Sequence, residues 1–549
     1  MIKNKIDGQT YLEMVVGGAS VLGAHSGEVD DLNVFPIPDG DTGINMLQTI
    51  QGGAEANANE IDISKESKTI AEAMLLSARG NSGVILSQFF AGIAKGLEGV
   101  DEADSVALAE AFKSGVEYAY KAVVKPTEGT ILTVMREATQ IASDSGAATP
   151  NEFFDSFIKA AEESLIHTPD LLPVLKKAGV VDSGGAGLIY IIKGMKRALD
   201  GEAFDRVSKK EEASGELDLD AFDENSVLEF GYCTELLLRL QNAKTNIEAF
   251  ETKTIIEYLE TIGDSIVAVK NGSIVKIHVH TMTPDKVLAF CQQFGEFLKI
   301  KIENMSLQHN NTTLPSDEDT IETHVEKDMG DFAIVAVANG DGIKESFTDM
   351  GVDVIVDGGQ SMNPSTEDFL KAFDEANAKK ILVFPNNSNI ILAATQASKL
   401  YKKSEVKVVN SKTIGDGYAA LSMLDTESGD LDAMASDCEM AMQGVVTAEI
   451  SQCVRDADFD GVSCVTGDYI GFAGKTLLAS AKTCQEATIK TVDKLDLENH
   501  EICIVIKGED ADENDVLEIE GYIASNYPSI ETYVIEGGQQ IYNYIIVAE

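Results

Sequence analysis

The sequence predicts a multidomain protein in which an all-α domain comes first, a small α+β domain follows, and an α/β domain ends the chain. Three observations support this order. The first part of the chain repeats the helical periodicity of apolar residues and contains no convincing alternating strand. A short middle segment alternates strands and helices around one predicted hairpin. The last part begins with strands that alternate with helices, as in a parallel sheet.

Polar, acidic and aperiodic stretches set the predicted domain boundaries. The domains and linkers are, in order, residues 1–202, an acidic linker at 203–226, residues 227–310, a second linker at 311–330, and residues 331–549. In the first domain, Thr10 and Glu13 have capping-box spacing ahead of a first helix. Further helical patterns cover residues 68–79, 83–97, 105–124, 130–143, 151–166 and 186–199.

Length and charge limit the function. A chain of 549 residues is long enough for about three domains with real cores. Lys and Arg number 43 against 91 Asp and Glu, and the net charge of −48 argues against a nucleic-acid or anionic-membrane partner. Seven scattered cysteines fit a reducing compartment. The N-terminal residues show no apolar core of a signal peptide, and the sequence shows no apolar run long enough to be a transmembrane segment. We therefore expect a soluble cytoplasmic protein.

The stretch Asn33–Met46, NVFPIPDGDTGINM, contains the first candidate site. Two prolines disfavour helix directly before Asp39 and Asp41, which stand at the predicted start of a helix. A hard cation such as Mg2+ binds carboxylate oxygens and bridges to phosphates. The pair therefore suggests a metal and phosphate site, and the simpler alternative is an Asp-Gly turn with a helix N-cap.

Four loops of the first domain share one pattern, glycine with a hydroxyl or amide residue directly before a helix. They are Asp39–Gly43, Ala78–Gly83, Thr127–Thr130 and Asp182–Gly187. Glycine allows close backbone approach, and a helix start supplies free amides and positive potential. Four such loops in one domain favour a nucleotide site over simple capping. None of them matches a Walker or Rossmann pattern, so the phosphate chemistry requires a different fold.

In the middle domain the chemistry concentrates in Cys233, His278 and His280. On a strand the two histidines project from the same face, and a thiol from a neighbouring strand would complete a possible Zn2+ site or a proton-transfer group. The alternative is a buried cysteine and a half-exposed polar face. Cys291 and His309 carry no comparable motif, and we interpret both as structural.

The C-terminal domain opens with the strands FAIVAVAN, VDVIVDG, KKILVFPNN and VKVVNS, with helices at residues 343–350, 367–376 and 390–400 between them. Three more strands and one helix follow after residue 500, in EICIVIKGED, DVLEIEGYIASNY, ETYVIEGG and YNYIIVAE. The loop GGQSMNPSTEDF precedes the second helix. Ser365 or Thr366 there has the position of an N-cap.

The four motifs NVFPIPDGDTGINM, ARGNSGVILSQFFAG, KPTEGTILTVMREA and VVDSGGAGL, in this order, resemble the nucleotide-binding DAK2 (DhaL-like) domain related to dihydroxyacetone kinases. The whole chain resembles the catalytic subunits of bacterial fatty acid kinases. The resemblance implies a DhaL-like helical barrel with ATP and two Mg2+ ions at one end, and a DegV-like C-terminal domain. It also implies a homodimer.

The resemblance also assigns site residues. Asp39 and Asp41 would bind Mg2+, and Asn33 stands near the place where related kinases have a third aspartate. The residues that would contact phosphates or line the nucleotide are Thr42, Asn45, Gly80, Ser82, Gly83, Thr130, Asp182, Gly184 and Gly185. Cys233, His278 and His280 would take part in phosphotransfer, through a metal such as Zn2+ or as acid–base groups. Ser361, Asn363 and Ser365 match the loop with which DegV-like proteins hold a fatty acid carboxylate.

These expectations describe an ATP-dependent kinase that phosphorylates a fatty acid to an acyl phosphate. A separate DegV-like fatty-acid-binding protein would present the acyl chain. A kinase for a dihydroxyacetone-type acceptor is one alternative. A lipid-binding regulatory protein with a nucleotide-sensing domain is another.

Overall fold

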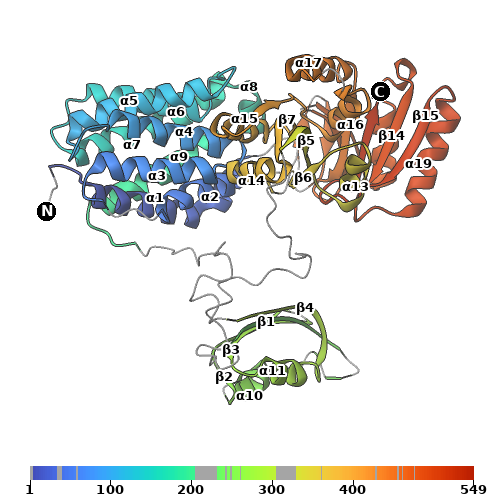
Figure 1. The fold of residues 1–549 in the computed structure, drawn as a ribbon, viewed down its shortest axis with the longest axis horizontal. Helices are drawn as coiled ribbons and strands as arrows, with labels where there is room; N and C mark the ends of the chain where they lie inside the picture. The colour runs from blue at the N-terminus through green and yellow to red at the C-terminus, as the bar shows by residue number, and fades with distance from the viewer. Residues whose placement is uncertain are drawn as a thin grey trace. The chain divides into compact units, whose positions relative to one another are not determined.

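A computed structural model of the chain describes residues 4–33, 40–56, 60–204, 232–241, 244–245, 247, 250, 252–259, 261–271, 273–304, 329–359, 362–426, 429–453, 457–459, 461–474 and 476–549. The chain divides into two compact units. One unit joins the helical domain to the C-terminal domain (Met1–Ser208 with Asp328–Glu549), and the other is the middle domain (Lys209–Lys327). Figure 1 shows the elements of each unit.

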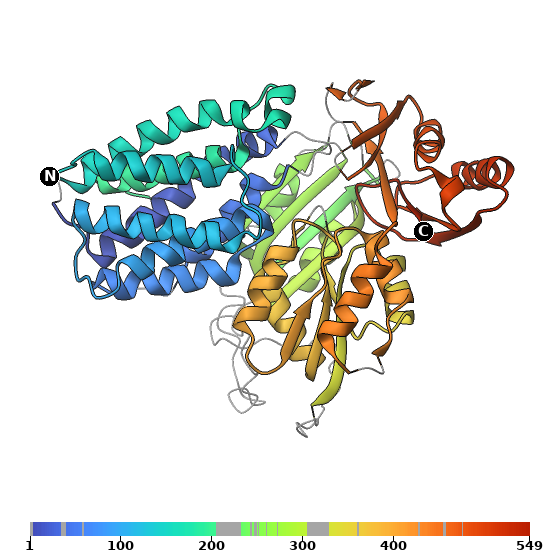
Figure 2. The ribbon, with the colours of Figure 1, turned by 90° about the horizontal axis from the view of Figure 1, so that it is seen from above.

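The first domain is helical throughout its described residues. Its helices are α1 (Gly8–Leu32), α2 (Thr42–Ala54), α3 (Ile63–Ser77), α4 (Gly80–Gly96), α5 (Ser105–Ala122), α6 (Ile131–Asp144), α7 (Pro150–Leu171), α8 (Pro173–Ala178) and α9 (Ser183–Leu199). From α1 to α7 each helix packs on the next, and α9 packs on both α7 and α1. The helices therefore close into a barrel, and the predicted all-α barrel is confirmed. Figure 2 shows these helices lengthwise and side by side.

The predicted helix boundaries are late where a cap was missed. Asp62 accepts hydrogen bonds from the amides of Ser64 and Lys65, so α3 begins five residues before the predicted start at residue 68. In the same way α9 begins at Ser183, directly after its cap Asp182, and not at residue 186. The aperiodic first turns of both helices explain the difference, because they carry little apolar signal.

Aromatic side chains fill the interior of the barrel. The Phe112 ring stands edge-on to four others at centroid distances between 5.2 and 5.7 Å, which are those of Phe89, Phe153, Phe154 and Phe157. Edge-to-face pairs at such distances add to the stability that burial alone provides. The ring cluster therefore joins α4, α5 and α7 on the inner side of the barrel.

The barrel closes where α1 crosses α9 at very short range. A Cβ atom added to Gly194 would lie 2.2 Å from the carbonyl oxygen of Gly17, and one added to Gly17 would lie 2.6 Å from that of Gly194. Real side chains do not approach backbone atoms so closely. Glycine at both positions is therefore a condition for the closed ring.

The middle unit has the predicted order of elements. These are β1 (Tyr232–Leu240), α10 (Lys253–Leu259), β2 (Gly263–Asn271), β3 (Ile274–Thr281), α11 (Pro284–Cys291) and β4 (Gly295–Asn304). The strands form one antiparallel sheet in the order β2-β3-β1-β4. Leu236, Leu238 and Ile277 lie in a buried cluster with Ile255 of α10 and Val287 of α11, so both helices cover one face of the sheet.

The C-terminal domain contains two main sheets. The first is parallel throughout, in the order β6-β5-β7-β8, and confirms the predicted α/β start of this domain. Its elements are β5 (Gly330–Ala338), α13 (Asp341–Asp349), β6 (Val354–Asp357), α14 (Thr366–Ala376), β7 (Ala378–Phe384), α15 (Ile391–Leu400) and β8 (Glu405–Val408).

The second sheet is mixed, in the order β13-β12-β9-β16-β14-β15, and a two-stranded ribbon of β10 and β11 accompanies it. Its elements, with the helices around it, are α16 (Ile414–Ser422), α17 (Leu431–Ala441), β9 (Val446–Gln452), β10 (Ala457–Phe459), β11 (Val462–Cys464), β12 (Tyr469–Ala473), β13 (Thr476–Ala481), α18 (Cys484–Val492), η3 (Leu497–Asn499), β14 (Ile502–Lys507), α19 (Glu513–Asn526), β15 (Glu531–Glu536) and β16 (Tyr544–Ala548). The sequence analysis assigned no element between residues 411 and 500. Several of these elements are very short, and Gly415 and Gly417 weaken the helical signal of α16.

The helical and C-terminal domains share a core. Ala78 and Val84 belong to the same buried cluster as Phe369 of α14 and Ala393 of α15. Helix α15 packs on α4, and α14 packs on α3 (Figure 1). No helix in the described ranges combines the length and the apolar character that crossing a bilayer requires.

The close crossing of α1 and α9 gives a first prediction. Gly17→Ala forces a methyl group onto the backbone of α9 and should lower the free energy of unfolding by about 1–3 kcal/mol. Gly27→Ala is a matched control in the same helix, because Gly27 has no heavy atom within 4 Å of an added Cβ. The control should raise stability by about 0.8–1 kcal/mol through helix propensity. Equal effects in urea unfolding would show that the crossing is not tightly packed.

Candidate functional site

The starts of α2, α4 and α9 lie together at one end of the barrel. The Ser183 hydroxyl at the start of α9 donates a hydrogen bond to the Thr42 hydroxyl at the start of α2, at 3.3 Å. A Cβ atom on Gly80, the first residue of α4, would lie 2.6 Å from the Asn45 side-chain nitrogen. The structure therefore brings together three of the four glycine loops that the sequence singled out.

The start of α6 joins this group through α9. A Cβ atom on Gly184 would lie 3.1 Å from the Ile131 Cβ atom at the first turn of α6. The side chains of Thr130 and Asp182 cap their helices, because Thr130 accepts from the Leu132 amide and Asp182 from the Gly185 amide. Four helix N-termini thus meet at one end of the barrel, which is favourable for a bound anion.

Asp41 occupies the N-cap position of α2 but its side chain makes no capping hydrogen bond. The capping oxygen comes from Asp30 in α1, which accepts from the Gly43 amide at 2.6 Å and from the Ile44 amide at 3.4 Å. Burial raises the pKa of Asp30, and these two amide bonds oppose the rise. The interpretation of Asp41 as a simple N-cap is therefore wrong, and its carboxylate does not serve the start of its own helix.

The sequence analysis missed Asp30, and no local pattern identifies it. It lies on the last turns of α1, 13 residues before the amide that it binds. Asn33, the candidate for a third metal ligand, ends α1, and its backbone amide donates to the Asp30 carbonyl. Asp39 lies outside the described residues, so its position stays a prediction.

Helix α4 also begins without a side-chain cap. Gly80 has a φ of +57°, in the left-handed region that glycine adopts without strain. A Cβ atom on Gly83 would lie 2.3 Å from the Thr49 hydroxyl of α2, so the first turn of α4 lies directly on α2. The predicted phosphate contacts at Gly80, Ser82 and Gly83 thus lie on a helix start that its neighbouring side chains leave uncapped.

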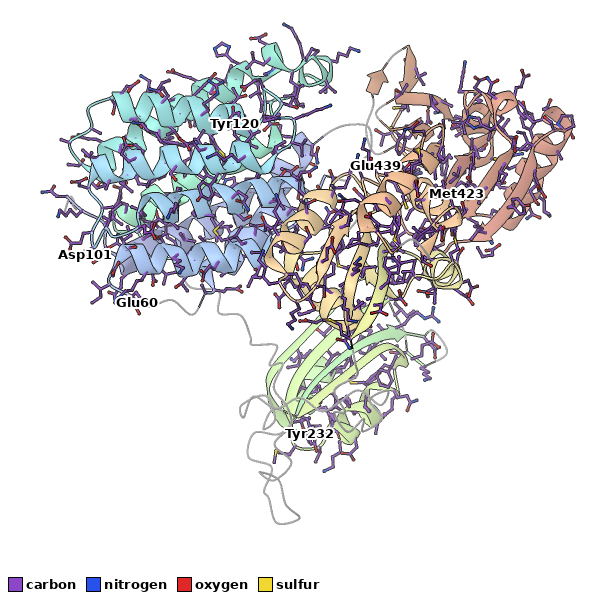
Figure 3. All side chains as sticks on the ribbon, turned by 45° about the horizontal axis from the view of Figure 1, so that its top comes forward. Glu60, Asp101, Tyr120, Tyr232, Met423 and Glu439 are labelled. Carbon is purple, nitrogen blue, oxygen red and sulfur yellow. The ribbon has the colours of Figure 1, made fainter. Side chains whose placement is uncertain are left out.

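Hydrogen bonds to Glu128 stabilise the loop before α6. This carboxylate accepts hydrogen bonds from the Thr133 hydroxyl at 2.7 Å, from Arg136 at 2.9 Å and from the Tyr120 hydroxyl at 3.1 Å. Figure 3 labels Tyr120 on α5. Desolvation opposes ionisation of Glu128, but the three hydrogen bonds outweigh it and lower its pKa. The loop that carries Thr130 is therefore held in a defined position.

A loop of the C-terminal domain reaches the same end of the barrel. The Asn363 side-chain amide donates a hydrogen bond to the Asp41 carboxylate. Arg79 donates to the Asn363 carbonyl at 2.8 Å, and the Thr366 amide donates to the Ala78 carbonyl at 3.1 Å. Sequence reasoning missed this contact, because no spacing pattern relates positions 322 residues apart.

Ser365 confirms the capping interpretation of this loop. Its hydroxyl accepts from the Asp368 amide, and the Asp368 side chain accepts from the Ser365 amide, which completes a capping box at the start of α14. Ser361 lies outside the described residues.

In the middle unit the strand register brings two of the predicted residues together. Cys233 of β1 pairs directly with His280 of β3, and Glu235 pairs with His278. The side chains of Cys233, His278 and His280 lie outside the described part of the chain, so their roles stay predictions. Within the described residues no group of three or more His, Cys, Asp or Glu side chains is placed to hold a metal ion.

Cys291 fits its structural interpretation. It is fully buried in the core of the middle unit, and burial raises the pKa of its thiol to about 12. His309 lies outside the described residues.

Models of known protein families match three successive parts of the chain. The DAK2 domain model matches residues 36–197. The models for the middle and C-terminal domains of FakA-like fatty acid kinase proteins match residues 229–312 and 333–549.

Curated relatives match along the whole chain. An uncharacterized protein of Staphylococcus epidermidis is 39% identical over 562 aligned residues, and an uncharacterized protein of Staphylococcus aureus strain USA300 is 37% identical over 561. Each alignment covers 100% of this chain and 100% of the relative.

Solved structures give weaker likenesses. A fatty-acid-binding DegV family protein from Thermus thermophilus has a TM-score of 0.31 at 16% identity and covers 40% of this chain and 99% of its own. The dihydroxyacetone kinase of C. freundii has a TM-score of 0.30 at 15% identity and covers 41% of this chain and 48% of its own. At these scores neither likeness supports a further conclusion.

The combination of a DAK2 domain with two further kinase-family domains defines a kinase-type protein. The chain belongs to the FakA-like fatty acid kinase family, because the domain models cover its three parts and relatives match its full length.

The burial of Asp182 predicts how the free energy of unfolding depends on pH. Although the residue keeps some exposure, burial of the carboxyl group raises its pKa from 3.8 to about 6, and the Gly185 and Ile131 amide hydrogen bonds oppose the rise. The folded protein therefore holds a proton that the unfolded chain releases in this window, so the free energy of unfolding should fall as pH rises from about 4 to about 6.

Asp182→Asn keeps a capping oxygen but removes the ionisation. The Tm of the variant minus that of the wild type should therefore become more positive as pH rises through this window. A Tm difference that is constant with pH would contradict the assigned burial of Asp182.

Proposed function

We propose that this protein transfers the γ-phosphoryl group of ATP to the carboxylate of a fatty acid that a separate DegV-like binding protein presents. In this reaction a carboxylate oxygen forms a bond to the γ-phosphorus while the bond from that phosphorus to the bridging oxygen breaks. The products are an acyl phosphate and ADP. The observation that carries the proposal is the meeting of four helix starts at one end of the barrel in a member of the FakA-like fatty acid kinase family.

The residues present fit a bound Mg2+. Asp30 takes over the capping of α2, so the Asp41 carboxylate is not needed for the fold of its own helix. Asp39 and Asp41 would hold the ion, with Asn33 as a further candidate. When bound, Mg2+ would neutralise charge on the transferring phosphoryl group.

The chain's own groups hold the nucleotide. Helix starts supply amides where a strongly acidic protein offers few cations. Thr42, Asn45, Gly80, Ser82 and Gly83 contact the phosphates. The other side of the nucleotide is lined by Thr130, Asp182, Gly184 and Gly185.

Cys233, His278 and His280 act in the phosphotransfer step. The pairing of Cys233 with His280 supports this proposal, because adjacent positions on neighbouring strands bring side chains within reach of one another. The three residues would hold Zn2+ or act as acid–base groups, and metal analysis decides between these roles.

A cavity of the C-terminal domain supports a separate carrier for the acyl chain. It lies at the carboxyl ends of β5 and β7, between the two main sheets, and residues such as Asn339, Asn386 and Gln539 line it. Its volume of about 60 Å³ is far below the roughly 300–1,000 Å³ of pockets for drug-sized ligands. This cavity is too small for a long acyl chain, which supports the proposal of a separate carrier.

The carrier requirement is the third prediction. ATP turnover should require both a fatty acid and the DegV-like protein that carries it, because a fatty carboxylate without an escort meets repulsion from a chain of net charge −48. The assay measures ADP and acyl phosphate formation with free lipid, with the loaded carrier and with dihydroxyacetone. Turnover with free lipid would contradict the requirement for a carrier protein. Turnover with dihydroxyacetone would favour the small-ketone kinase, and lipid binding without turnover would favour the regulatory protein.

The middle domain gives the fourth prediction. Cys233→Ala and His280→Ala should lower phosphotransfer by orders of magnitude and leave the Kd of ATP unchanged, because the helical domain contains the nucleotide site. Cys484→Ala in the C-terminal domain is a matched control and should keep full activity. Equal loss of ATP binding in the Cys233 and His280 variants would contradict a chemical role. Zinc at one ion per chain that is lost in Cys233→Ala would identify a metal site.

A further inference from the structure

We infer that Asn363 of the C-terminal domain is a positioning residue of the nucleotide site, which orients the Asp41 carboxylate for its cation. This inference rests on the proposed function, since it assigns a role toward the metal that Asp41 would hold. It gives the C-terminal domain a direct part in a site that belongs otherwise to the helical domain.

The contact itself is specific. The Asn363 side-chain nitrogen donates to the Oδ2 atom of Asp41, and the same nitrogen lies 3.5 Å from the position of a Cβ atom on Gly80. The Asn363 side chain therefore lies next to the first residue of α4 as well as next to the start of α2. It touches the two helix starts that lack a side-chain cap of their own.

The loop that carries Asn363 is fixed on both sides. Arg79 donates to the Asn363 carbonyl and forms an ion pair with Asp368 at 3.4 Å. Ser365 forms a β-bridge with Arg79 and a capping box with Asp368. Asn363 is only 2% exposed, so its side chain has little freedom to turn away from Asp41.

The stability of the interface between the two domains does not by itself explain the hydrogen bond from Asn363 to Asp41. The Asn363 side-chain oxygen is buried and has no hydrogen-bond partner among the described residues. A buried polar atom without a partner lowers the stability of the fold. An apolar side chain of the same size would avoid this penalty, but it could not donate a hydrogen bond to Asp41. The Asn363 side-chain nitrogen is the group that makes this bond.

The physical role follows from the carboxylate. A carboxylate that binds a metal needs a fixed orientation, and a hydrogen bond to its second oxygen provides one. Loss of such an outer partner lowers metal affinity or activity by about 10–100-fold in other metal sites. Asn363 should therefore act on the cation through Asp41, without contact to the nucleotide being required.

The test measures the Kd of ADP by calorimetry, with Mg2+ and with EDTA, on the full chain. Asn363→Ala removes the amide, and Asn363→Leu removes it while keeping the buried volume, so that a folding defect in one variant does not decide the result. Asn389→Ala is the matched control. It deletes a second asparagine of the same domain interface, whose oxygen accepts from Asn81 at 3.1 Å and does not reach Asp41. Asp41→Asn is the reference for loss of the metal ligand.

Asn363→Ala and Asn363→Leu should raise the Kd of ADP about 10–100-fold with Mg2+ and leave it unchanged in EDTA. The double variant Asp41→Asn/Asn363→Leu should bind no more weakly than Asp41→Asn alone, because the amide acts through the carboxylate. An unchanged or lower Kd with Mg2+, or an equal rise in EDTA, would overturn the inference while Asp41→Asn still weakens binding. If Asp41→Asn has no effect either, the proposed metal site itself is overturned, and the inference with it.

Discussion

The closure of the barrel, with α1 packed on α9 through Gly17 and Gly194, is the constraint on which the rest of the structure depends. In the described part of the first domain eight helices form the ring, and short connections make neighbours run in opposite directions. Every second helix of the ring therefore begins at the same end. Those helices are α2, α4, α6 and α9, and the contacts between their first turns show that they meet.

The converging helix starts compensate for the acidic composition of the chain. With a net charge of −48, the chain repels the phosphates that it is proposed to bind. Converging helix starts offer amides and positive dipole potential without added cations. Asp30 and Asp41 differ in role at this end, because the Asp30 carboxylate caps the start of α2 and the Asp41 side chain does not.

The sequence predicted the structural features that depend on local residue patterns. The glycine loops, the helices of the barrel and the parallel start of the C-terminal domain all carry short-range signals, and Ser365 carried a recognisable cap. Asp30 and Asn363 carried none, because each acts on a partner that only the folded chain brings near. The strands between residues 446 and 481 escaped for another reason, since runs of three to seven residues give too few alternations to recognise.

The contact between Asn363 and Asp41 also changes the view of the C-terminal domain. The loop that carries Asn363 reaches the end of the barrel where four helices begin, and the two domains share a buried cluster, so we propose that the domain is part of the nucleotide site. Hydrogen–deuterium exchange with and without Mg2+ and ADP tests this claim most directly. Protection should rise together in residues 42–45, 80–83, 130–131, 182–185 and 362–366. Protection confined to other segments, or absent from residues 362–366, would contradict a single site built from both domains.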